Sequence, residues 1–282
     1  MPNIIKTTVL ILISFFGITE IKAQDVIYEK KDSIFIEDII IKHPVGKYDT
    51  TGKRILALAK EFIGKSYVTE TLDKYYNEPL YISSTKFDCT TFVELVLAAS
   101  VCKETNFDNI CKTLEQMRYR SGIRNGYTSR LHYISWWIAD PAKQYIIKEV
   151  KTTLHSATQR LCLTFMSSHP ESYSQLKSDK QKTEKIAALE NDWHGIDIKY
   201  IPKENIEYAT IKEINNGDII AIVTAIEGLD VSHIGFAHWH NDELHMIHAS
   251  SAEGKIIDDP TPLHEYLAKK KNNLGIRIFR AL

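Results

Sequence analysis

The chain has 282 residues, of which 44% are hydrophobic and 25% are charged, and its formal net charge is −1. This composition is ordinary for a globular protein and excludes a collagen-like, mucin-like or disordered chain. Broad nucleic-acid binding requires a concentrated basic surface, so the near-neutral charge predicts no nucleic-acid partner.

The first 23 residues have the pattern of an export signal. Lys6 precedes a short apolar run over residues 9–18, and Ala23 provides a small residue at a cleavage point. The run is shorter than the about 20 apolar residues that span a bilayer. We therefore interpret residues 1–23 as a secretory signal peptide, with an uncleaved anchor as the alternative. We expect the mature protein to be secreted to the periplasm and not to associate with the membrane once the signal peptide is cleaved.

The remainder divides into an N-terminal extension, residues 24–50, and one main domain, residues 51–282, with a helical insertion at about 103–200. The extension contains a short strand or helix over 33–41. Apolar residues at three-to-four spacing predict a helix over 52–63 that ends at Gly64. The next helix begins at Cys89 and is apolar almost all round, which predicts burial on most sides.

The second half of the chain has the pattern of a sheet. Residues 103–190 are mainly helical and polar, whereas strands are predicted after Trp193. Turn residues at 215–218 and at Asn241-Asp242 separate strands over 219–223, 231–240 and 243–250, and 275–280 forms another. Helices first and antiparallel strands second indicate an α+β fold.

Cys89 is the candidate nucleophile. Asp88 is a good N-cap residue, and Thr91 with Glu94 could form a second capping pair. Cys89 then lies in the first helical turn, where the positive end of the helix favours a thiolate and free N–H groups can hold an oxyanion. The alternative is a buried structural cysteine.

The other three cysteines carry less information. Four cysteines are too few for a disulfide scaffold in a chain of this length, and no CxxC pair suggests a structural zinc site. Cys102 and Cys111 are close enough in sequence for a local disulfide, which the sequence alone leaves open.

His233 is the candidate acid/base partner of Cys89. His233, Gly235 and Ala237 share one strand face, and the two small residues would leave room for a helix to approach. If the 241–242 turn pairs residue 240 with residue 243, His248 becomes a diagonal neighbour of His233 and could orient its ring. A three-residue loop would break this register.

A metal site is the rival interpretation of the histidines. His238, His240 and His245 cluster near the same turn, and His-x-His can bind zinc. His238 and His240, however, lie on the strand face opposite to His233. We expect them to be solvent-facing residues at a hairpin tip, and we expect no metal and no cofactor.

The motifs in this order resemble those of NlpC-type cell-wall peptidases, which are papain-like. The matching segments are 87–94, 217–220, 232–235 and 247–250, and Gly64-Lys65-Ser66-Tyr67 resembles an upstream Gly-Lys-x-Tyr segment. Thr90-Thr91 and the segments 130–137 and 200–202 resemble the N-acetylmuramoyl-L-alanine amidase-like branch more closely. The resemblance covers roughly residues 50–282.

The resemblance implies a papain-like fold in which a helix-borne cysteine packs on an antiparallel sheet. It also implies a cysteine amidase that cleaves muropeptides between (anhydro-)N-acetylmuramic acid and L-alanine, with Cys89, His233 and His248 as catalytic residues. An endopeptidase that cuts within the stem peptide, for example after D-glutamate, and a non-catalytic glycan-binding module remain as alternatives.

The resemblance also suggests residues that bind the muropeptide. They are Tyr67, Asp88, Tyr133, Trp136 and Trp137, of which Tyr67 is expected beside Cys89 and could help to hold the oxyanion. The aromatic rings of the insertion could stack on sugar faces, although a plain core helix would look the same. We expect the insertion to form the wall of a narrow pocket near Cys89, bounded by residues from 120–200. The sequence does not indicate the oligomeric state.

Overall fold

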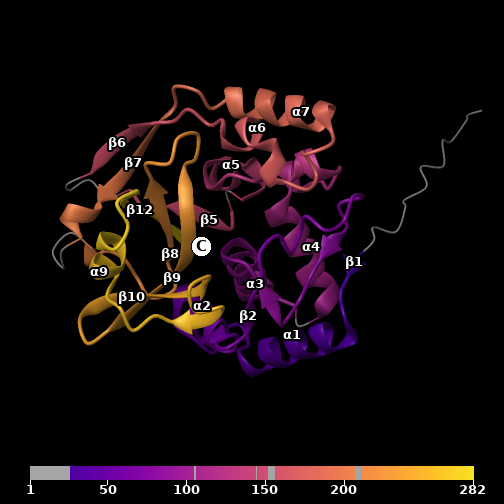
Figure 1. The fold of residues 1–282 in the computed structure, drawn as a ribbon. Helices are drawn as coiled ribbons and strands as arrows, with labels where there is room; N and C mark the ends of the chain where they lie inside the picture. The colour runs from indigo at the N-terminus through magenta and orange to yellow at the C-terminus, as the bar shows by residue number, and fades with distance from the viewer. Residues whose placement is uncertain (1–25, 105, 144, 152–155, 207–210) are drawn as a thin grey trace, which may run out of the picture.

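The computed structural model describes residues 26–104, 106–143, 145–151, 156–206 and 211–282, so the predicted signal peptide lies outside the described residues. It has the predicted α+β class, with a helical part beside a large sheet (Figure 1). The helices are α1 (Lys30–Lys42), α2 (Thr51–Lys60), α3 (Cys89–Val101), α4 (Phe107–Arg118), α5 (Ile134–Ala139), α6 (Phe165–Ser168), α7 (Lys180–Asn191) and α9 (Leu263–Ala268). Short 3-10 helices cover Arg120–Gly122, Tyr127–Ser129, Pro141–Lys143, Pro170–Ser172 and Lys203–Asn205.

Ten of the described strands form one sheet, and two more form a small parallel pair, β1 with β3. The strands are β1 (Val26–Ile27), β2 (Ser66–Tyr67), β3 (Leu80–Tyr81), β4 (Lys86–Phe87), β5 (Ile147–Glu149), β6 (Ala157–Arg160), β7 (Asp197–Pro202), β8 (Ile219–Thr224), β9 (Val231–His240), β10 (Glu243–Ser250), β11 (Lys255–Asp258) and β12 (Asn273–Ala281). The large sheet has the order β4-β2-β11-β10-β9-β8-β12-β7-β6, and β5 also pairs with β12. The sequence predicted β8, β9, β10 and β12 but gave no bounds for the shorter strands.

The β9–β10 hairpin has the predicted register. His240 pairs with Glu243, and the ladder continues to Phe236 with Ile247. Asn241 and Asp242 both have positive φ, 49° and 64°, as a two-residue type I′ turn requires. The turn therefore places His233 and His248 on neighbouring strands, as expected from the alternation of residues.

The two faces of β9 have different partners, and this corrects one expectation. Helix α3 packs on the face that carries Ile234 and Phe236, where the Phe92 and Phe236 rings meet at 5.6 Å in a T-shaped contact. The face of Gly235 and Ala237 turns instead toward a second apolar cluster under α9. Gly235 does not admit α3; a Cβ there would lie 2.8 Å from the His248 Cβ, so the glycine makes room for β10.

The segment predicted as an N-terminal extension joins the main core. Strand β1 pairs with β3, and α1 buries Ile36, Ile39 and Ile40 in the same apolar cluster as α3. Figure 1 shows α1 running beneath α3 and α4. Among the described residues, no helix is long and apolar enough to cross a membrane.

All four cysteines are unpaired, so the local disulfide between Cys102 and Cys111 is absent. Both side chains are buried within the apolar core. The Cys102 thiol donates a hydrogen bond to the carbonyl oxygen of Glu104, at 3.2 Å. Packing around α3 and α4 therefore takes the place of a covalent link.

A buried ion pair fastens α4 to α3. The Arg118 Nε donates to the Glu94 Oε2 at 2.8 Å, and both side chains are almost fully buried. Arg118 also donates to the carbonyl oxygen of Tyr81 at 2.8 Å. Glu94 therefore does not form the predicted capping pair with Thr91; the capping box joins Thr91 to Asp88 instead.

We predict that Arg118→Met destabilises the fold by about 3–5 kcal/mol, because it leaves the Glu94 carboxylate buried without a counter-charge. Urea unfolding followed by circular dichroism would measure the loss. The double variant Glu94→Leu with Arg118→Met removes both charges and should recover most of the stability. Equal stability of Arg118→Met and the natural chain would contradict the role of this pair.

Candidate active site

The start of α3 places Cys89 as predicted. Asp88 is the N-cap residue, with its Oδ1 accepting from the Thr91 backbone N–H at 2.7 Å while its own N–H donates to the Thr91 Oγ1 at 3.0 Å. The second carboxylate oxygen accepts from the Thr71 hydroxyl at 3.0 Å. Both oxygens of Asp88, expected to bind substrate, therefore have partners within the protein, one of them as the cap of α3, and Cys89 is the first residue of that helix.

The resting state of Cys89 differs from the predicted thiolate. Burial and, to a smaller extent, the Asp88 carboxylate raise the pKa of the Cys89 thiol to about 11, although the Ile234 N–H and Thr90 act in the opposite direction. A helix terminus contributes about 0.3–1 kcal/mol, less than the about 1.4 kcal/mol that one pKa unit represents. Desolvation therefore wins, and Cys89 rests as a neutral thiol.

The Cys89 sulfur lies against the strand that carries His233. The backbone N–H of Ile234, the residue after His233, is close enough to lower the pKa of the Cys89 thiol. Cys89 and His233 also line the same pocket. The structure thus brings together the predicted nucleophile and the predicted base, which are far apart in the sequence.

His233 and His248 form the predicted pair. The His233 Nε2 lies 2.6 Å from the His248 Nδ1, and the two rings meet edge to face at 4.8 Å. On its other side, the His248 Nε2 lies 3.2 Å from the Asp259 Oδ2. A chain of three side chains, His233–His248–Asp259, therefore leads away from Cys89.

The carboxylate fixes where each proton of this chain lies. Burial raises the pKa of Asp259, but hydrogen bonds from Thr261 and His248 hold it below its usual range, so the group is ionised and can only accept. The His248 Nε2 must then donate, which leaves its Nδ1 as an acceptor. The His233 Nε2 must donate to that nitrogen, and the His233 Nδ1 keeps a free lone pair, as a general base requires.

His233 is held neutral by its surroundings. Burial, which has the largest effect, together with the nearby His248 and Lys270 lowers its pKa to about 3. The ring of Tyr266 on α9 stacks near His233, 6.4 Å between centroids, and meets the His248 ring at 5.5 Å. Tyr266 therefore limits the movement of both imidazoles.

Asp259 and Tyr266 were not found from the sequence. Asp259 follows β11, in which Ile257 pairs with His248, so that the carboxylate falls two residues beyond the paired position. The adjacent acidic residues Asp258 and Asp259 before Pro260 were the available signal. They could be interpreted only after β11 was known to pair with β10.

The pocket around Cys89 has a volume of about 870 Å³. Its walls come from Tyr67, the β10–β11 connection and the segment from Asp259 to Asn273. None of its described lining residues comes from 120–200, so the expected wall from the insertion is wrong. Tyr67 does lie beside Cys89; burial raises its pKa, as do the nearby Cys89 and Asp88, so its hydroxyl stays protonated and can donate.

The insertion aromatics are core residues. Tyr133, Trp136 and Trp137 are at most 2% exposed. The Tyr133 hydroxyl donates to the Glu190 Oε1 at 2.5 Å and its ring packs on Trp136. Their predicted stacking on sugar faces is therefore wrong, because the insertion folds inward and uses these rings to attach itself to the rest of the domain.

The histidines at the hairpin tip have protein partners. The His238 Nδ1 lies 2.8 Å from the Asp258 Oδ1, and the His245 Nδ1 lies 3.0 Å from the carbonyl oxygen of Asp259. His245 is buried, contrary to the expected exposure. No group of three or more metal-ligating side chains occurs in the part of the chain that the structure describes.

We predict that Asp259→Asn lowers kcat by about 10–100-fold, the usual cost of losing a supporting partner. An amide can donate to the His248 Nε2 and so invert the proton order along the chain. Asp258→Asn is the matched control, since Asp258 pairs with His238, and it should retain most of the activity. Steady-state kinetics of the two variants would decide, and equal losses would contradict the chain.

We also predict that iodoacetamide alkylates Cys89 slowly at pH 6 and that the rate rises with pH through the range 7–9. With the Cys89 pKa raised to about 11 and the His233 pKa lowered to about 3, the reactive thiolate is a minor form that grows as pH rises. The rate can be followed by intact-protein mass spectrometry. A fast rate that is flat from pH 5 to 8 would indicate a resting thiolate–imidazolium pair and contradict this prediction.

Comparison with known proteins agrees with this geometry. The family model described as AmiA-like, N-acetylmuramoyl-L-alanine amidase-like, matches residues 57–276. The solved structure of an N-acetylmuramoyl-L-alanine amidase from Bacteroides uniformis is 35% identical, with a TM-score of 0.79 over 82% of this chain and 99% of that one. A structure from Bacteroides fragilis, provisionally described as a xylanase, is 39% identical, with a TM-score of 0.76 over 80% of this chain and 99% of that one.

A more distant neighbour shows the fold alone. A Legionella pneumophila protein is 24% identical, with a TM-score of 0.67 over 89% of this chain and 94% of that one. Among curated proteins, none matches significantly. The family match and the Bacteroides uniformis amidase structure show that the chain belongs to the N-acetylmuramoyl-L-alanine amidase-like family.

Proposed function

We propose that this protein is a cysteine amidase that hydrolyses the bond between (anhydro-)N-acetylmuramic acid and L-alanine in peptidoglycan fragments. The observation that carries the proposal is the Cys89 sulfur at the start of α3, against the N–H of Ile234, beside the His233–His248–Asp259 chain. The same arrangement supports a place in the NlpC-type, papain-like superfamily. Cell-wall fragments are released outside the cytoplasm, which agrees with the predicted export signal.

The geometry supports a two-step acyl transfer. Cys89 attacks the lactyl amide carbonyl while its proton passes to the His233 Nδ1, so that a carbon–sulfur bond forms without a free thiolate beforehand. The carbon–nitrogen bond then breaks, and His233 returns the proton to the leaving amine of L-alanine. Water, deprotonated by His233, hydrolyses the thioester and releases the muramic acid carboxylate and the thiol.

The oxyanion formed in each step has two candidate donors. The backbone N–H of Cys89 lies in the first turn of α3, where no helical carbonyl can accept it. The Tyr67 hydroxyl lines the same pocket and remains protonated. Together they would supply the fixed dipoles that stabilise developing negative charge. No step calls for a metal or a cofactor.

Glycoside hydrolysis fits the pocket less well. It requires two carboxyl groups that flank the bond, one of them protonated. The acidic residues lining the pocket are Glu253, Asp258 and Asp259. Asp258 is paired with His238 and Asp259 with His248, so the pocket favours attack by sulfur on an amide over acid–base attack on a glycosidic bond.

We predict that Cys89→Ala abolishes release of the stem peptide from soluble muropeptides while the fold and its unfolding curve stay unchanged. The products of anhydro and reducing-end muropeptides, identified by mass spectrometry, would show which bond is cut. Cleavage after D-glutamate would instead identify a stem-peptide endopeptidase. Full activity of the Cys89→Ala variant would exclude the cysteine mechanism, and loss of activity on chelation with EDTA would indicate a metal enzyme.

A further inference from the structure

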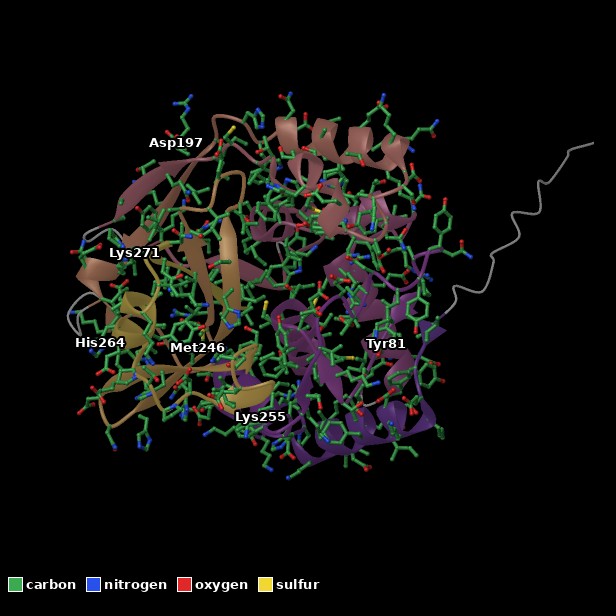
Figure 2. The ribbon with its side chains drawn as sticks, in the orientation of Figure 1. Tyr81, Asp197, Met246, Lys255, His264 and Lys271 are labelled. Atoms are coloured by element: carbon green, nitrogen blue, oxygen red, sulfur yellow. The ribbon has the colours of Figure 1, made fainter. Side chains whose placement is uncertain are left out.

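Three consecutive lysines, Lys269, Lys270 and Lys271, follow α9 and line the pocket that contains Cys89. We call them the lysine loop. All three are exposed, and Figure 2 labels Lys271 at this place in the fold. The Lys269 Nζ donates to the Thr261 Oγ1 at 3.2 Å, and the Thr261 N–H donates to Asp259. Lys269 therefore connects the loop, through Thr261, to the end of the histidine chain.

Among the described residues, no carboxylate forms an ion pair with the lysine loop. In the part of the chain that the structure describes, neither Lys270 nor Lys271 pairs with a carboxylate. Two of the acidic residues that line the pocket, Asp258 and Asp259, are paired with histidines. The loop thus offers ammonium groups to whatever enters the pocket.

Lys270 also acts on the catalytic histidines. The pKa of His233 is lowered mainly by burial, then by His248, and the charge of Lys270 lowers it further. The pKa of His248 is also lowered mainly by burial, and Lys270 adds to that shift. The reaction requires His233 to become an imidazolium for a moment. A bare ammonium near the ring opposes that step, whereas a carboxylate bound to Lys270 would remove the opposition.

The position of the leaving group indicates which part of the substrate faces the lysine loop. His233 must protonate the leaving nitrogen, so the departing peptide begins at His233 and runs along the pocket. In a muropeptide the sugar carries no charge once its lactyl carboxyl is in the amide, and the negative charges lie on the peptide, beginning with the D-glutamate that follows L-alanine. An acidic leaving peptide therefore complements the lysine loop.

We propose, on the basis of the function proposed above, that the lysine loop binds a carboxylate of the leaving stem peptide and that Lys270 restricts turnover to peptides that carry it. Binding then supplies both affinity and the neutralisation that lets His233 accept a proton. Acidic peptides are cleaved, and peptides whose carboxylate is amidated are cleaved slowly.

The test uses two muramoyl tripeptides that are identical except for the D-glutamate α-carboxyl, free in one and amidated in the other. The natural enzyme should favour the free carboxylate by about tenfold in kcat/KM, the range of a charge-assisted hydrogen bond. Lys270→Gln should bring the ratio close to one, partly by speeding the amidated substrate. Lys270→Arg should keep the preference, as should Lys185→Gln, which removes one exposed lysine from α7, outside the pocket.

Two results would overturn the inference while the proposed function stands. One is a natural enzyme that cleaves both substrates equally well, and the other is a ratio that Lys270→Gln leaves unchanged. Failure of the enzyme to cut either substrate between muramic acid and L-alanine would overturn the proposed function itself, and this inference with it.

Discussion

The active site depends on one carboxylate that can accept hydrogen bonds but cannot donate them. Asp259 obliges His248 to donate toward it, which in turn obliges His233 to present an unprotonated nitrogen at its other edge. The pairing of β9, β10 and β11 places these three side chains in line. The strand pairing therefore allows the Asp259 carboxylate to select the tautomer of His233 through His248. Tyr266 packs against both imidazole rings.

The helical insertion supports the site from behind and does not enclose it. Its aromatic residues and the Tyr133–Glu190 hydrogen bond close an interior layer beside α5 and α7. Its short strands β5 and β6 extend the sheet on the side of β12 that is remote from the hairpin. Much of the pocket wall comes instead from the segment after β11, which also carries Asp259 and the lysine loop.

Features that neighbouring residues determine were predictable from the sequence, whereas features that depend on tertiary packing were not. The hairpin register follows from a two-residue turn and strict alternation, and the position of Cys89 follows from the Asp88 cap, so both were correct. The direction of Trp136 and the pKa of Cys89 depend on burial, which no local pattern specifies. Asp259 depends on a strand of only four residues whose pairing partner had to be known first.

Strand β12 lies inside the large sheet, between β8 and β7, although it comes about fifty residues after β8 in the chain. Until residues 273–281 are made and docked, β8 presents an open edge of unpaired backbone groups that invites association with other chains. Helix α3, which carries Cys89, can form early. The sheet that carries His233 and His248 is incomplete until β12 pairs with β8. Synthesis from the ribosome would therefore deliver the thiol long before the machinery that makes it reactive, and we expect folding governed by this non-local pairing to be slow.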